Sequence, residues 1–297
     1  MQALGRCCAC LAAGTLRAAR VRGRPFSSSV DAQEVSKFSS LAAQWWADPS
    51  GGSFAGLHRL NEARVPIIRR ALCGDFMPRR LAALGAAGEP APGPGAPLAG
   101  LALLDAGCGG GILSEALARL GAHVTGLDAS AEVLAAARAH AQLDAAVARR
   151  TTYVHSTIEA LAASGAAFDG VVCSEVLEHV ANPDAFVAHL AALTRPGGHL
   201  VLTTINRTLP ALWGAVLAAE YVLRLVPAGT HEWAKFVKPG ELAGALEGAG
   251  CEVQAVQGMA FNPLSGRWSL TQSTSINYAL VARRRLPAGG SEAQGQA

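Results

Sequence analysis

A glycine-rich loop between an apolar run and a helix-like stretch most constrains how this chain can fold. Residues 101–104 are apolar, Asp105 ends the run, Gly107–Gly111 follow, and residues 112–120 have helical periodicity. Glycine lets a chain turn sharply and lets a ligand approach the backbone closely. In open α/β sheets, ligands bind beyond the carboxyl ends of the strands, where such loops lie. The loop therefore predicts a binding site on a sheet.

The surrounding residues alternate between strand and helix patterns. Strands are predicted at 101–104, 123–127, 153–154, 168–173, 199–203, 252–256 and 276–282, and helices at 112–120, 131–141, 185–193 and within 241–251. Alternation of this kind is typical of a mostly parallel sheet covered on both faces. We therefore predict an α/β fold for residues 101–283, followed by a disordered Gly- and Ser-rich tail at 284–297.

The first thirty residues differ in composition from the rest. Residues 1–30 contain five arginines and three consecutive serines, and no acidic residue precedes Asp31. This composition is typical of a mitochondrial transit peptide, with processing near Phe26. The alternative is a disordered basic arm that binds an acidic partner. Residues 31–84 have helical periodicity and predict an N-terminal helical cap, and residues 85–100 predict a flexible Pro/Gly linker.

Composition excludes several classes of protein. No uncharged apolar run of eighteen residues is present, so no transmembrane helix is indicated. The net charge of +3 does not indicate a nucleic-acid-binding protein. The seven cysteines are odd in number, and their single CxxC spacing, Cys7 to Cys10, lies in the predicted transit peptide, which indicates reduced thiols and neither a disulfide framework nor a zinc site.

Two acidic residues near the loop indicate the kind of ligand. Asp128 ends the strand after the loop, at the distance where an acidic residue takes ribose hydroxyls. Asp105 heads the loop, where it would repel a pyrophosphate and suit a cation. S-adenosylmethionine has a ribose, a sulfonium and an ammonium group but no phosphate. The loop and the later Arg-Pro-Gly-Gly turn at 195–198 resemble those of class I methyltransferases that use this cofactor.

The segment 174–180, Ser-Glu-Val-Leu-Glu-His-Val, follows the fourth predicted strand and leaves alternatives open. If the segment is helical, Glu175, Glu178 and His179 share one face and could hold a divalent ion such as Mg²⁺. Alternatively, His179 is a general base that takes a phenol proton while the glutamates orient it or the cofactor. The third interpretation is a polar helix start without function.

Longer motifs resemble one family, the ubiquinone biosynthesis O-methyltransferases, including its mitochondrial branch. The resemblance runs from about residue 33 to 283, apart from the linker. It is carried by LDAGCGGGILSEALARLGAHVTGLD (104–128), EVLEHV (175–180), INRT (205–208), AEYVLRLVPAGTHEWAKFVKP (219–239), FNPL (261–264) and INYAL (276–280). It implies a Rossmann-like class I methyltransferase fold: a mostly parallel, seven-stranded sheet with one antiparallel strand, flanked by helices, with an N-terminal helical extension.

The resemblance also implies roles for particular residues. Arg64, Gly107, Asp128 and Ser174 match the positions that bind the cofactor. Glu175, Glu178 and His179 match the Mg²⁺ ligands of the mitochondrial branch, and His179 and Glu175 are the candidate catalytic residues. The substrates implied are polyprenylated catechol-type rings, dihydroxy-polyprenylbenzoate and demethylubiquinol, in coenzyme Q synthesis.

An apolar stretch at 209–227 lies inside a predicted lid insertion, 205–240. It carries interfacial residue types, and we interpret it as a helix that docks on the membrane holding the substrate, against the alternative of a buried lid. The family implies a peripheral position on the matrix side of the mitochondrial inner membrane, in a complex with other ubiquinone-biosynthesis enzymes. Two alternative functions are a non-catalytic S-adenosylmethionine-binding scaffold subunit and a nucleotide-dependent oxidoreductase. The absence of the G-x-G-x-x-G pattern and the presence of Asp105 disfavour the oxidoreductase.

Overall fold

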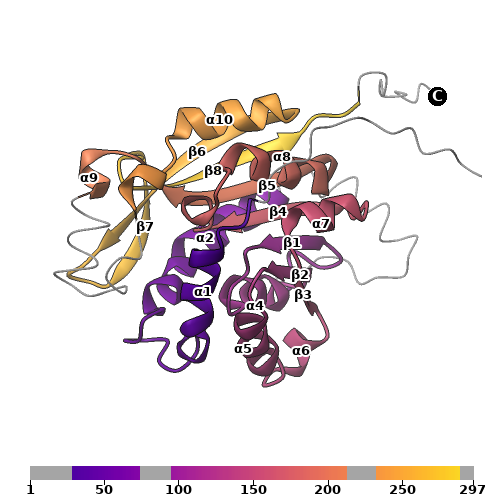
Figure 1. The fold of residues 1–297 in the computed structure, drawn as a ribbon, viewed down its shortest axis with the longest axis vertical. Coiled ribbons are helices and arrows are strands. Elements are labelled where there is room, and N and C mark those ends of the chain that lie inside the picture. The colour runs from indigo at the N-terminus through magenta and orange to yellow at the C-terminus, as the bar shows by residue number, and fades with distance from the viewer. Residues whose placement is uncertain (1–28, 74–94, 213–231, 288–297) are drawn as a thin grey trace, which may run out of the picture.

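A computed structural model describes residues 29–73, 95–212 and 232–287. Its centre is a twisted sheet with strand order β3-β2-β1-β4-β5-β8-β6-β7 (Figure 1). The strands are β1 (Ala102–Ala106), β2 (His123–Asp128), β3 (Thr151–His155), β4 (Phe168–Ser174), β5 (Thr194–Ile205), β6 (Cys251–Asn262), β7 (Arg267–Thr271) and β8 (Asn277–Arg284). β1 to β5 are parallel, β8 is antiparallel to both β5 and β6, and β7 is antiparallel to β6. The strand order reverses between β1 and β4, where α/β sheets bind ligands.

Helices cover both faces of the sheet, as the alternating pattern predicted. They are α4 (Ile112–Arg119), α5 (Ala131–Ala141), α6 (Ala145–Ala148), α7 (Ile158–Ala163), α8 (Pro183–Leu193), α9 (Leu209–Ala211) and α10 (Pro239–Gly248). Side-chain caps mark several of their starts: Ser130 accepts from the Val133 amide, and Asn182 accepts from the Ala185 amide. These bonds satisfy amides that the first helical turn leaves without partners.

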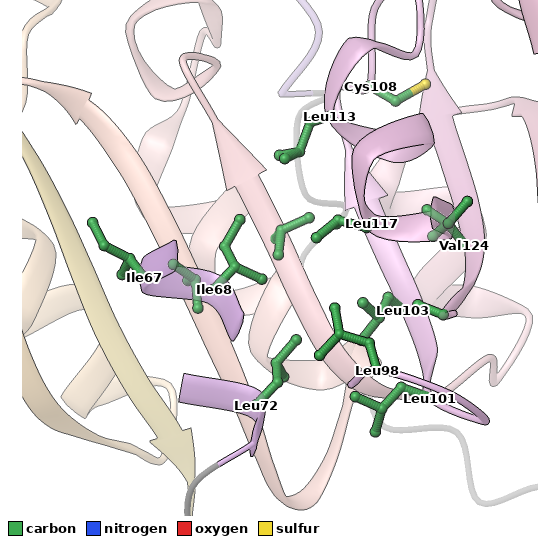
Figure 2. Packing of buried hydrophobic residues seen from close by; sticks show 14 of the residues in the cluster. Ile67, Ile68, Leu72, Leu98, Leu101, Leu103, Cys108, Leu113, Leu117 and Val124 are labelled. Atoms are coloured by element: carbon green, nitrogen blue, oxygen red, sulfur yellow. The ribbon is translucent and has the colours of Figure 1, made fainter. Parts of the chain in front are cut away.

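Each face of the sheet has its own apolar core. Successive strand residues point to opposite faces, so Leu103 packs with α2 and α4 whereas Leu104 packs with α7 and α8. Figure 2 shows Ile68, Leu98, Leu103 and Leu117 meeting in the first core. This burial anchors the strand ends that carry the glycine loop.

The N-terminal cap consists of α1 (Ala32–Ser40), η1 (Ala42–Gln44) and α2 (Ala55–Cys73). α2 lies on the sheet, where its Leu60 and Ile68 join the first core. The chain before α1 is hydrogen-bonded to residues that follow β4. Val30 forms an isolated bridge with Val180, and the Ser29 carbonyl accepts from the Ala181 amide at 2.8 Å. The cap therefore spans the carboxyl ends of the strands.

The α/β prediction is confirmed, with local differences. The described sheet has eight strands, because β7 extends it beyond the seven predicted, and two of them, β7 and β8, run opposite to the rest, where one antiparallel strand was predicted. β7 is an edge strand with mostly exposed side chains, so its sequence lacks the apolar run used to recognise buried strands. α2 also begins at Ala55, earlier than the predicted start near Asn61.

Several predicted segments lie outside the described residues, wholly or in part. They are the transit peptide at 1–28, the linker up to residue 94, the lid between 213 and 231 and the tail from 288. Among the helices of the described residues, none has the length and apolar character needed to cross a membrane.

Candidate functional site

A cavity of about 680 Å³ lies at the carboxyl ends of the parallel strands. That volume is within the usual range of small-molecule sites. Its lining combines the glycine loop after β1, the end of β2, the end of β4, the N-terminal cap and the β6–β7 hairpin. Arg64, Gly107, Asp128, Ser174, Glu175 and His179, all singled out from the sequence, line this one cavity.

The glycine loop takes a conformation that requires glycine. Gly107, Gly109 and Gly111 have φ values of 72°, 52° and 84°. A Cβ atom on Gly109 would lie 2.2 Å from the ring of Trp45, which packs directly on the loop. The Gly107 amide donates to the Leu127 carbonyl at 2.8 Å, tying the loop to β2. Backbone groups of the loop thus line the cavity without side chains in the way.

Asp128 holds the loop from the end of β2. Its Oδ2 accepts from the Gly109 amide and its Oδ1 accepts from the Ser130 amide, both at 2.9 Å. Burial raises the pKa of Asp128, while these backbone donors lower it. A carboxylate fixed in this way has further lone pairs for a ligand's hydroxyl groups.

Arg64 projects from α2 into the cavity and is buried, with 3% exposure. Its guanidinium donates to Asn61 Oδ1 at 2.7 Å, to the Leu57 carbonyl at 3.2 Å and to Ser174 Oγ at 2.8 Å. Burial lowers its pKa to about 10, so the group stays charged at neutral pH. A buried cation in a fixed orientation is a site for a carboxylate.

A hydrogen-bonded chain leads from Arg64 to Glu175. Ser174 Oγ lies 2.6 Å from Thr203 Oγ1, which donates to Glu175 Oε1 at 2.7 Å. Burial raises the pKa of Glu175, and the nearby Glu178 raises it further. The ends of β4 and β5 thus connect the candidate carboxylate-binding and catalytic residues.

The segment 174–180 is not an α-helix. Glu175 has a φ of 57°, and η2, a 3-10 helix, covers only Leu177–His179. The condition under which Glu175, Glu178 and His179 would share one helical face is therefore not met. Glu178 Oε2 instead accepts from Thr204 Oγ1 at 2.8 Å, and its buried Oε1 has no hydrogen-bond partner. Within the described ranges, no three His, Cys, Asp or Glu side chains are grouped to hold a metal ion.

His179 pairs with a residue that the sequence did not indicate. Its Nδ1 lies 2.9 Å from Glu34 Oε2 in α1, and Phe38 packs edge-on against the ring. This hydrogen bond lowers the pKa of Glu34 and is the largest contribution to that shift. The sequence also did not indicate the roles of Trp45 and Thr203 in the site, because these roles depend on contacts between segments that are distant in the sequence.

Asp105, at the head of the loop, is buried and accepts from Ser114 Oγ at 2.6 Å. Burial raises its pKa to about 6 from the ordinary 3.8. Because the folded state binds this proton more tightly than the unfolded state, ionised Asp105 destabilises the fold. This destabilisation is fully present above the pKa of Asp105 in the folded state, and it disappears below the pKa of Asp105 in the unfolded state.

We therefore expect Asp105→Asn to raise the free energy of unfolding of the ligand-free protein at pH 7.5 by about 3 kcal/mol at most. The advantage should shrink as the pH falls from 7 to 4, because wild-type Asp105 becomes neutral. Urea denaturation at several pH values measures it. A difference between variant and wild type that does not change with pH would contradict the assignment.

Comparisons with known proteins agree with this geometry. A family described as a methyltransferase domain matches residues 68–256. The ubiquinone biosynthesis O-methyltransferase of Methylobacterium sp. (strain 4-46) is 46% identical over 88% of this chain and 98% of its own length. The mitochondrial ubiquinone biosynthesis O-methyltransferase of Arabidopsis thaliana is 41% identical over 90% of this chain and 79% of its own.

Solved structures have the same fold. An O-methyltransferase family protein from Burkholderia thailandensis superimposes with a TM-score of 0.50 and 16% identity. The match covers 78% of this chain and 58% of that one.

Proposed function

This chain belongs to the ubiquinone biosynthesis O-methyltransferases, and from that premise we infer how its cavity carries out methyl transfer. It is an S-adenosylmethionine-dependent O-methyltransferase of ubiquinone biosynthesis, and its acceptor is a ring hydroxyl of a polyprenylated aromatic compound. One observation supports the assignment most strongly: buried Arg64 and loop-bound Asp128 line the same cavity.

We assign the cofactor contacts from this arrangement. Arg64 pairs with the methionyl carboxylate, and Ser174, to which Arg64 donates, lies beside it. Asp128 accepts from the ribose hydroxyls, and the Gly107 backbone lies along the cofactor. Asp105 supplies negative charge near the cationic groups. Each contact uses a group already fixed by hydrogen bonds, which lowers the entropy cost of binding.

The chemical step is a displacement at the sulfonium methyl group. A ring oxygen attacks the methyl carbon, the carbon–sulfur bond breaks, and S-adenosylhomocysteine leaves. The ring hydroxyl must lose its proton, since a phenol resembles tyrosine, with a pKa of about 10. We propose that His179 takes this proton. Glu34 accepts from Nδ1–H, which makes Nε2 the basic nitrogen and orients the ring.

The Mg²⁺ proposal rests on the two glutamates. Glu178 has a buried oxygen without a hydrogen-bond partner, and its charge raises the pKa of Glu175. A divalent cation would relieve this repulsion, and carboxylate oxygens are ligands that Mg²⁺ prefers. His179 fits less well, since its Nδ1 is paired with Glu34 and nitrogen is a poor ligand for Mg²⁺. When bound, the ion would supply Lewis acidity to a ring hydroxyl.

We expect EDTA to reduce methyl transfer by residues 29–297 at least tenfold, and Mg²⁺ to restore it. Mg²⁺ should also raise the melting temperature of the wild type but not of Glu178→Gln, a readout independent of activity. Asp184→Asn, which changes an exposed carboxylate at the start of α8, is the matched control. Activity and melting that are both indifferent to EDTA and Mg²⁺ would reject the metal and leave His179 as the base.

The chain is mitochondrial, as is its Arabidopsis thaliana relative, and its acid-free, arginine-rich start supports this location. We further propose a peripheral position on the matrix side of the inner membrane, in a complex with other enzymes of the pathway. The apolar residues at 209–227 and the apolar character of a polyprenylated substrate support this proposal.

A further inference from the structure

The cavity continues beyond the groups assigned to the cofactor and the proton. Part of its wall is formed by Leu57 of α2 together with Met259, Phe261 and Trp268 of the β6–β7 hairpin. None of these four side chains has a role in the methyl transfer described above. Figure 1 shows the hairpin at the edge of the sheet, next to α2.

Strand register explains why apolar side chains gather on this wall. Phe261 pairs with Trp268 and Met259 pairs with Leu270 across β6 and β7. Cross-strand partners lie on the same face of a sheet, so the cavity-lining residues Met259, Phe261 and Trp268 form one apolar strip. The rings of Phe261 and Trp268 lie 5.5 Å apart, and both side chains are only partly buried. The strip therefore offers apolar surface to the cavity.

The strip reaches the outside of the molecule. Pro263, at the end of the hairpin, still lines the cavity, and the next residue, Leu264, is 98% exposed. Because Leu264 is exposed, it does not contribute the hydrophobic stabilisation that its burial would provide. Apolar side chains therefore occur both in the cavity lining and at the tip of the hairpin.

Other residues of the lining are charged. Asp31, Glu34 and Lys37, at and within α1, line the cavity, and Lys235 forms ion pairs with Asp31 at 3.5 Å and Glu34 at 3.8 Å. An alkyl chain passing this way would have to remove charged groups from water, which is costly. A bound apolar chain is therefore favoured along the hairpin.

We propose that Leu57, Met259, Phe261 and Trp268, with Leu264 at the exit, form the subsite for the first isoprene units of the substrate's tail. The inference rests on the proposed function, which supplies a ring acceptor with such a tail. The ring lies near His179, and the tail leaves between α2 and the hairpin. The subsite makes tail length a determinant of specificity.

The test compares kcat/KM for dihydroxybenzoate acceptors with no tail, one prenyl group and a farnesyl group. For the wild type, kcat/KM should rise with tail length. Phe261→Ser should lower the ratio of farnesyl to tailless kcat/KM about tenfold or more, as expected for lost apolar contact. Phe261→Leu, which keeps an apolar side chain, should restore most of that ratio. Leu143→Ser, at an exposed leucine outside the cavity lining, is the control.

The outcomes separate the two proposals. An equal loss on all three acceptors, or no loss on any, overturns the tail subsite while methyl transfer by the wild type stands. No transfer by the wild type to any acceptor, with cofactor binding intact, would reject the proposed function itself. Calorimetric binding of S-adenosylhomocysteine to each variant checks that it is folded.

Discussion

Replacing Arg64 with glutamine is expected to weaken S-adenosylmethionine binding by about 30-fold or more, because it leaves a buried carboxylate without its partner. Truncating one member of a buried charged pair costs about 2–5 kcal/mol, or roughly 30- to several-thousand-fold in Kd. Arg64→Lys should recover little of this affinity. The lysine ammonium keeps the charge but cannot maintain the contacts with Asn61, Leu57 and Ser174 while pairing with a carboxylate.

Isothermal titration with S-adenosylmethionine and S-adenosylhomocysteine measures this effect. Arg70→Gln is the matched control, since Arg70 lies on the same helix but is exposed. Adenosine, which lacks the carboxylate, should bind wild type and Arg64→Gln with similar affinity. If S-adenosylhomocysteine binds Arg64→Gln within threefold of its wild-type affinity, Arg64 does not hold the cofactor carboxylate.

The part of the cavity lining formed by the glycine loop and Asp128 could be predicted from the sequence because these residues are local to strand ends. Asp128 is the last residue of the short strand β2, and the glycine loop follows β1. In a parallel sheet, strand ends meet at one edge, so recognising the strands was enough to bring these residues together. Arg64 was different: its position on α2 predicted no contact with Ser174, and only the family resemblance assigned it to the cofactor.

The part of the site proposed to be catalytic depends on contacts that no local pattern encodes. Glu34 meets His179 across 145 positions of sequence, and Thr203 joins Ser174 to Glu175 from a neighbouring strand. The helical interpretation of 175–179 failed because Glu175 adopts a left-handed conformation after β4. Nothing in the residue types of that segment distinguishes such a turn from a helix start.

The second large effect concerns the contact between the cap and the glycine loop. Gly109→Ala is expected to lower the free energy of unfolding by about 2–5 kcal/mol, combining a strained positive φ with overpacking against Trp45. It should also weaken cofactor binding, since the Gly109 amide holds Asp128. Gly165→Ala is the matched control: Gly165 has a φ of 76°, but its Cβ would meet nothing within 4 Å. That substitution isolates the backbone strain, about 1–2 kcal/mol.

A double-mutant cycle with Trp45→Ala then separates strain from overpacking. Trp45 stacks on Phe54 at 4.0 Å, so removing it will itself destabilise the cap. In the Trp45→Ala background, however, Gly109→Ala should cost only about as much as Gly165→Ala, and the difference between the two backgrounds is the coupling energy. If Gly109→Ala lowers the free energy of unfolding equally in both backgrounds, as measured by urea denaturation, the Trp45 ring moves aside for the added methyl group without a free-energy cost. The cap would then be mobile over the loop, and the geometry of Glu34 against His179 would not be held by this packing.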